Sequence, residues 1–126
     1  MRKNMENTTN LIDFLETTNK NIHNLEAEAL NFLEQGNNQG HLECMKQKAN
    51  LLANIYTHAK PYLKDLPKDI RRKAEARLEA FSESAVQSLK IGSVFFMSAL
   101  LYPDEHKPGQ PNNLELLIEE IKTQIA

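Results

Sequence analysis

The sequence predicts an all-α protein: an elongated antiparallel three-helix bundle with long, coiled-coil-like helices, followed by a short C-terminal amphipathic helix. Residues that favour helices, chiefly Leu, Ala, Glu and Lys, dominate the 126-residue chain, which has four Gly and no Trp. Apolar residues recur three and four positions apart, which is the period of one face of a helix. No stretch alternates polar residues with β-branched apolar ones, as a half-buried strand would.

Charge, cysteine content and hydropathy narrow the class of protein. The net charge of −2 gives no general attraction to polyphosphates, and the single cysteine, Cys44, cannot form an intramolecular disulfide. The polar N-terminus lacks the apolar segment of a secretory signal. The most apolar run, residues 91–102, is shorter than the roughly 20 residues that cross a bilayer. We therefore expect a cytoplasmic protein with no membrane span.

The first helix is expected to begin after Thr8 or Thr9, whose hydroxyl can cap the first free amides. It is expected to end at Gly36, which can adopt the left-handed C-cap conformation, and Gly40 is expected to loosen the connection that follows. The apolar seam of this helix comprises Leu11, Leu15, Ile22, Leu25, Ala29 and Phe32. This spacing is that of a heptad, which pairs two helices along a narrow seam.

The second helix is expected to span residues 41–59 and to run antiparallel to the first, because the loop between them is short. Its seam comprises Leu42, Met45, Ala49, Leu52, Tyr56 and Ala59. Pro61 should kink or end this helix, since its ring clashes with the preceding turn. Pro67 stops the apolar rhythm and suits the first turn of a third helix.

The third helix is expected to reach Tyr102. Gly92 weakens it by about 1 kcal/mol relative to alanine, and marks either a close helix approach or a soft point. Residues 95–97, Phe-Phe-Met, place bulky side chains on adjacent faces of the helix. One of these faces lies outside a two-helix seam, so the terminal helix or another protein must cover it.

Residues 103–113, with three Pro and one Gly, form a linker between the bundle of residues 1–102 and a final helix over residues 114–126. Asn112 or Asn113 is the expected cap of this helix. Its apolar stripe comprises Leu114, Leu117, Ile118, Ile121 and Ile125. So short a helix is marginal alone. The stripe must therefore dock, either on its own bundle or in the groove of a partner protein, and it is the candidate partner-binding site.

No pattern of catalytic or metal-binding residues stands out. His41 and Cys44 form an H-x-x-C pair, but two ligands are too few for a zinc site. The sequence has no Gly-rich phosphate loop and no nucleophile elbow. We expect a protein that is not an enzyme and that binds neither metal nor cofactor.

One basic cluster comprises Lys68, Arg71, Arg72, Lys73 and Arg77. Asp69, Glu75 and Glu79 lie among these residues, which favours a solvated helix surface with intrahelical ion pairs. Nucleic-acid binding through Arg71, Arg72 and Lys73 is the weaker alternative, because stacking aromatics and groove-reading motifs are missing.

Residues 26–36, EAEALNFLEQG, and residues 48–56, KANLLANIY, resemble the helical hairpin of the FlgN-like export chaperones of the bacterial flagellum. The resemblance extends over roughly residues 11 to 100. It departs from the family at residues 81–87, FSESAVQ, near which many members carry an asparagine. It implies a small helical chaperone without enzymatic activity or cofactor, whose C-terminal part binds an amphipathic segment of an exported protein.

The leading hypothesis is therefore a cytosolic chaperone of flagellar type III secretion, with a hook-associated protein as client. Two alternatives stay open. The heptad seams can pair between chains, which predicts a helical oligomerisation or adaptor module and a homodimer. The basic cluster predicts a small nucleic-acid-binding regulator whose binding weakens with salt.

Overall fold

The computed structural model describes the backbone of residues 2–125 and the side chains of residues 6–125. Within this part of the chain all regular secondary structure is α-helical, which confirms the predicted fold class. The helices are α1 (Arg2–Glu34), α2 (Asn38–Ala53), α3 (Ile55–Leu63), α4 (Lys68–Ile91), α5 (Val94–Ala99) and α6 (Asn113–Ile125).

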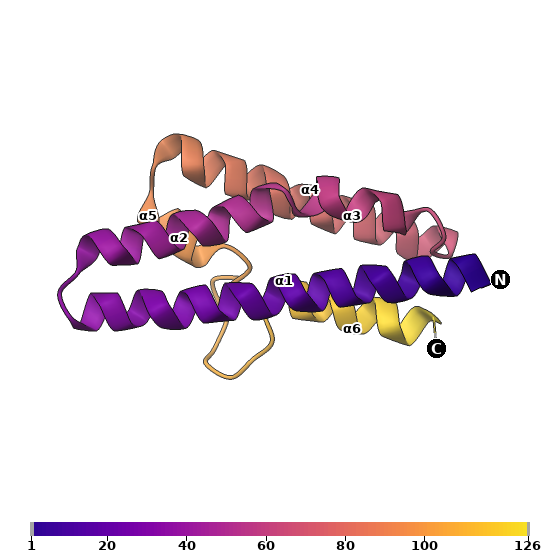
Figure 1. Ribbon diagram of the computed structural model, residues 1–126, viewed down its shortest axis with the longest axis horizontal. Coiled ribbons are helices and arrows are strands. Elements are labelled where there is room, and N and C mark those ends of the chain that lie inside the picture. Colours follow the sequence, from indigo (N-terminus) through magenta and orange to yellow (C-terminus); the bar gives the residue numbers. More distant parts are fainter. Residues whose placement is uncertain (1, 126) are drawn as a thin grey trace.

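Three long rows of helix form an antiparallel bundle (Figure 1). Helix α1 runs along its whole length, α2 and α3 return as one interrupted row, and α4 runs back beside them. The short α5 then turns back towards α2, and α6 packs on α1 and α4 near the chain termini. The half of the bundle that contains the termini therefore has a fourth helix, whereas the other half has only α5.

Helix α1 begins at Arg2, so the prediction that it starts after Thr8 or Thr9 was wrong. Thr8 is 8% exposed and lies three residues before Leu11 on the buried face, so it belongs to the seam and does not cap the helix. The C-cap prediction is confirmed, because Gly36 has a φ of 75°.

Gly40 does not loosen the connection between α1 and α2, because it lies in the first turn of α2. A Cβ atom at this position would stand 2.6 Å from Cγ of Phe32. The glycine therefore allows the end of α1 to approach the start of α2 closely. Asn37 caps α2 by accepting a hydrogen bond of 2.9 Å from the Gly40 amide.

The predicted second helix is interrupted at Asn54, not at Pro61. The Ser82 hydroxyl of α4 accepts a hydrogen bond of 3.2 Å from the Tyr56 amide and donates one of 2.9 Å to the Leu52 carbonyl. In an uninterrupted helix that amide would bond directly to that carbonyl. An inserted hydroxyl therefore separates α2 from α3. Pro61 lies inside α3 with its ring exposed.

Helix α4 ends at Ile91, so the prediction of a helix that continues to Tyr102 was wrong. Gly92 adopts a left-handed conformation with a φ of 73°, and its amide donates to the Ser88 carbonyl. The Ser93 hydroxyl then accepts a hydrogen bond of 3.1 Å from the Phe96 amide and caps α5. The soft point predicted at Gly92 is therefore a complete helix end, after which the chain reverses direction.

The linker between α5 and α6 begins with a strained turn. Leu101 is the one residue other than glycine with a positive φ in the described chain, at 76°, and its side chain is buried. Its carbonyl accepts a hydrogen bond of 2.9 Å from the Asn113 amide. Such a conformation costs of order 1–3 kcal/mol and persists only where the surroundings enforce it. Burial and this hydrogen bond hold the turn in place.

Candidate partner-binding groove

The apolar stripe of α6 is buried against α1 and α4. Four of the five residues in the predicted binding site, Leu114, Leu117, Ile118 and Ile121, are buried in the core, while Ile125 is 37% exposed. They pack where α6 meets α1 and α4. Of the two alternatives that the sequence left open, the structure shows the stripe docked on its own bundle. Partner binding through this stripe would require α6 to detach from α1 and α4, and it stays a prediction.

Polar contacts fasten the start of α6 to the middle of α1. The predicted cap is confirmed, because Asn112 Oδ1 accepts from the Glu115 amide and Glu115 Oε1 accepts from the Asn112 amide, both at 2.8 Å. The buried side chain of Asn112 also donates from Nδ2 to Asn19 Oδ1 at 2.9 Å. Asn19 Nδ2 in turn donates to Glu115 Oε2, and His23 Nε2 lies 3.2 Å from the same oxygen.

These contacts change the acidity of Glu115. Partial burial raises the pKa of this carboxyl, but hydrogen bonds from the Asn112 amide, Asn19 and His23 lower it more. The net pKa lies below its ordinary value. The ionised carboxylate therefore favours the docked position of α6, and this contribution is lost as the pH falls through the lowered pKa.

A buried lysine joins α1 and α2 to α5 and to Tyr102 beyond it. Lys48 has no exposed surface, and its Nζ lies 3.0 Å from Glu26 Oε2 and donates to the Ser98 carbonyl at 2.9 Å. The Tyr102 hydroxyl donates to the other Glu26 oxygen at 2.8 Å. The ammonium group also lies 5.0 Å from the centre of the Tyr102 ring, within the range of a cation–π contact.

Burial lowers the pKa of Lys48, although the neighbouring Glu26 carboxylate opposes this effect. Burial also raises the pKa of the Tyr102 phenol, and its hydrogen bond to Glu26 raises it further. Every buried polar side-chain atom in the described part of the chain has a hydrogen-bond partner. We interpret this network as a structural connection, because it holds Ser98 and Tyr102 against α1 and α2.

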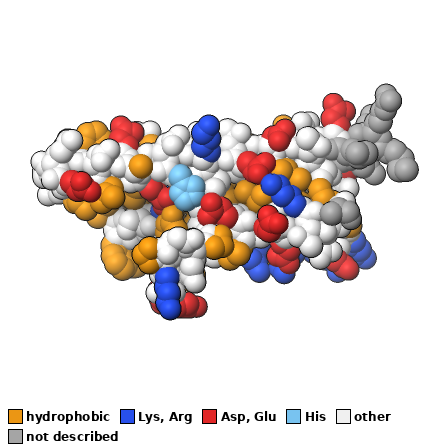
Figure 2. Space-filling view, turned by 90° about the horizontal axis from the view of Figure 1, so that it is seen from below, with side chains coloured by type: hydrophobic (Ala, Val, Ile, Leu, Met, Phe, Trp, Pro, Cys, Tyr) orange, Lys and Arg blue, Asp and Glu red, His pale blue; other side chains and the backbone are white. Residues whose placement is uncertain are grey.

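Hydrophobic side chains remain exposed around α5. In the Phe-Phe-Met stretch Met97 is buried, whereas Phe95 is 72% and Phe96 is 49% exposed. Ile91 and Val94 beside them are also exposed. Figure 2 shows hydrophobic side chains gathered at the end of the molecule away from the chain termini. The prediction that one face of residues 95–97 lies outside the helix seam is thus confirmed, and α6 does not cover that face.

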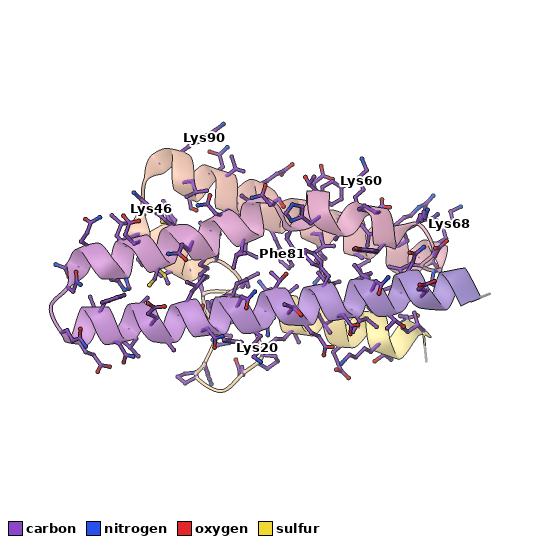
Figure 3. The ribbon with its side chains drawn as sticks, in the orientation of Figure 1. Lys20, Lys46, Lys60, Lys68, Phe81 and Lys90 are labelled. Carbon is purple, nitrogen blue, oxygen red and sulfur yellow. The ribbon has the colours of Figure 1, made fainter. Side chains whose placement is uncertain are left out.

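A groove of about 1150 Å³ opens between the second half of α4 and the segment from α5 to Tyr102. One wall is the face of α4 from Glu79 to Ile91, and the other contains Phe96 and residues 99–102. Leu52 and Tyr56 also line the groove, together with Phe81, which lies between the α2–α3 row and α1 in Figure 3. The labelled Lys20, Lys46, Lys60 and Lys90 point outwards in the same view.

The groove continues the course of α6. Helix α6 covers the first half of α4, where Lys73 pairs with Glu120, and its first residue, Asn113, already lines the groove. Beyond that point α5 packs on α4 and α2, and the groove lies between α4 and α5. The first half of α4 is therefore covered by a full-length helix, whereas the second half meets only the short α5 and keeps an open groove.

The remaining residues singled out in the sequence lie elsewhere. His41 Nδ1 lies 3.1 Å from the Ala29 carbonyl, and Cys44 is buried, so the two side chains do not face a common ligand. Burial raises the pKa of the Cys44 thiol. Among the described residues no group of three or more His, Cys, Asp or Glu side chains is placed to bind a metal ion.

The basic cluster lies on the first half of α4, away from the groove. Arg71 donates to the Lys64 carbonyl, Lys73 pairs with Glu120, and Arg72 and Arg77 are exposed. The exposed positions fit the predicted solvated surface, but the predicted intrahelical ion pairs are missing, because among the described residues the one ion pair of α4 joins Lys73 to α6.

The sequence pointed to part of the groove. It identified the bulky face at residues 95–97, but it placed these residues in a continuous helix, so the wall that Phe96 and residues 99–102 form opposite α4 was missed. A signal for Lys48 was present, because Lys48 lies between Met45 and Leu52 on the inner face of α2. Comparison of the chain with known protein families, with curated proteins and with solved structures found no match. No helix of the described residues is long and apolar enough to cross a membrane.

Proposed function

We propose that this protein is a helix-binding chaperone or adaptor that holds an amphipathic segment of another protein in the groove between α4 and α5. The observation that carries the proposal is the open groove between α4 and α5, with Ile91 and Phe96 exposed along it. An apolar helix face laid into such a groove is a common mode of peptide recognition.

Helix α6 supports the choice of occupant, because it packs its apolar stripe on the first half of the same helix, α4. It is a 13-residue helix with one apolar stripe buried and its polar face in solvent. A client segment of similar length and pattern would meet the same kind of surface. Burying four apolar side chains contributes about 1.5–3 kcal/mol each before the costs of association, enough for micromolar binding.

The resemblance of residues 26–36 and 48–56 to FlgN-like chaperones supports a more specific proposal. Residues 26–36 form the end of α1 and the turn after it, and residues 48–56 form the end of α2 and the start of α3. We propose that the client is a hook-associated protein of the flagellum, kept in the cytoplasm until type III secretion. In this proposal the protein has no enzymatic activity.

The test compares two surface variants with matched exposure. Phe96→Glu places a charge in the groove, whereas Leu116→Glu places one on the outer face of α6, and the two native side chains are 49% and 48% exposed. Calorimetric titration with a purified hook-associated protein should show binding to the native chain and to Leu116→Glu. Phe96→Glu should weaken the affinity at least about tenfold, since it buries a charge against an apolar face.

Two outcomes would contradict the proposal at different levels. If the hook-associated protein does not bind the native chain, the flagellar client is wrong. If it binds and Phe96→Glu weakens it no more than Leu116→Glu, the groove is not the binding site.

A further inference from the structure

The charged side chains of α4 that line the groove are acidic. The basic cluster, including Lys73 and Arg77, lies towards the start of α4 and outside the groove, whereas Glu79, at the middle of α4, and Glu83 line it. These two glutamates are exposed, lie four residues apart and form no ion pair with another described side chain. The groove lining includes no Lys, Arg or His. The wall that α4 presents to an occupant is therefore apolar with an acidic edge.

The docking of α6 shows how this protein uses flanking charges. Glu120 of α6 pairs with Lys73 on the basic half of α4, and Lys122 of α6 pairs with Glu16 of α1 at 2.9 Å. In both pairs a residue of α6 meets a residue of opposite charge on the helix that it faces. In the groove, where α4 presents Glu79 and Glu83, the matching edge of an occupant is basic.

We infer that the groove selects an amphipathic helix whose apolar face is bordered, on the side of α4, by two Lys or Arg residues about one turn apart. This inference rests on the proposed function and specifies the chemistry of the client. Two glutamates four residues apart lie on one ridge of α4, about 6 Å from each other along the helix. A pair of basic residues with the same spacing on the client can meet both.

The same edge disfavours a second copy of this chain as the occupant. Helix α6 carries Glu115, Glu119 and Glu120 around its apolar stripe. Placed in the groove of another copy, it would bring carboxylates towards Glu79 and Glu83. The acidic edge therefore allows the groove to accept a client helix with a basic edge and to reject α6 of another copy.

The test uses two synthetic peptides of 13 residues with an identical apolar face. One carries Lys and the other Glu at the two edge positions. Titrated against the full-length protein at low salt, the Lys peptide should bind about tenfold more tightly, because each exposed ion pair contributes a few-fold in affinity and each like-charge pair removes as much. The difference should shrink at about 0.5 M salt, where exposed charges are screened.

Charge reversal on the protein completes the test. Glu79→Lys/Glu83→Lys should reverse the preference, so that the Glu peptide binds more tightly. The matched control, Glu28→Lys/Glu43→Lys, changes the net charge equally at exposed positions on α1 and α2 outside the groove. It should retain the preference for the Lys peptide.

Each other result overturns a defined part of the argument. If both peptides bind the native protein equally, or if Glu79→Lys/Glu83→Lys leaves the preference unchanged, the acidic edge does not select the client. In that case binding that is still weakened by Phe96→Glu keeps the proposed function intact. If neither peptide binds, the groove does not accept an amphipathic helix, and both the selection and the groove-based function fail.

Discussion

The ammonium group of Lys48 has no contact with solvent, and the Glu26 carboxylate that balances its charge is partly exposed. Removing Lys48 and removing Glu26 should therefore have different effects on the free energy of unfolding. Without Glu26 a buried charge loses its counterion. Without Lys48 the Glu26 carboxylate still contacts water and still accepts a hydrogen bond from the Tyr102 hydroxyl.

We expect Glu26→Ala to destabilise the fold by about 3–5 kcal/mol. The substitution removes the partly exposed partner of the ion pair and leaves the buried Lys48 charge without a counterion. Lys48→Met should cost clearly less, because it fills similar space without a charge. Urea unfolding followed by circular dichroism measures both free energies. Equal losses for the two variants would show that the Lys48 charge is not the cause of the difference.

The contacts of single polar residues were the feature of the structure that could least be predicted from the sequence. Ser82 reads as an ordinary helix residue, yet its hydroxyl interrupts the helix on the other side of the interface at Asn54. Nothing local to residues 41–59 signals that break. It depends on the register of α4 against α2, which becomes known only when the two helices are packed.

At the level of helices, the sequence predicted the fold class, the hairpin of the first two rows and the cap of α6 correctly, because periodicity and capping are local signals. It misjudged where helices end. Pro61 was tolerated on an exposed face of α3, and Gly92 ended α4 completely. Such outcomes depend on what each face meets in the folded chain.

The docking of α6 is an element-scale prediction that hydrogen exchange can check. We expect the amides of residues 117–121 to be protected to the same order as those of residues 45–52, because both segments bury side chains in one core. Leu117→Ala should lower the protection of α6 and cost about 2–5 kcal/mol in unfolding free energy. Fast exchange in α6 beside a protected bundle would instead support the predicted role of its stripe in partner binding.

For the whole molecule, the heptad seams are already used within one chain. Leu11, Leu15 and Ile22 of α1 have no exposed surface. Pairing these seams between chains would require the bundle to open, which argues against the oligomerisation module and the homodimer that the sequence left open. What the sequence could not supply is the position of the groove, since its walls come from α4 and from a segment that reverses direction after Gly92.

We therefore expect sedimentation of the isolated protein at micromolar concentration to give a monomer, and Phe96→Glu to leave that result unchanged. The physical reason is that the exposed apolar surface around α5 faces an edge with Glu79 and Glu83, which repels the acidic α6 of another copy. A tight dimer that Phe96→Glu dissociates would show that a second copy occupies the groove. That result would contradict the proposal of a different protein as client.

The contacts of α6 also determine the order in which the molecule can fold. The Asn19–Glu115 and Glu16–Lys122 contacts join residues 96 and 106 positions apart, whereas the turn that joins α1 to α2 spans only a few residues. Closing a long loop costs more conformational entropy than closing a short one, and distant contacts slow folding. We expect the α1–α2 hairpin to form early and α6 to dock in the final step, so that the unfinished bundle exposes the first half of α4, which α6 later covers, beside the groove.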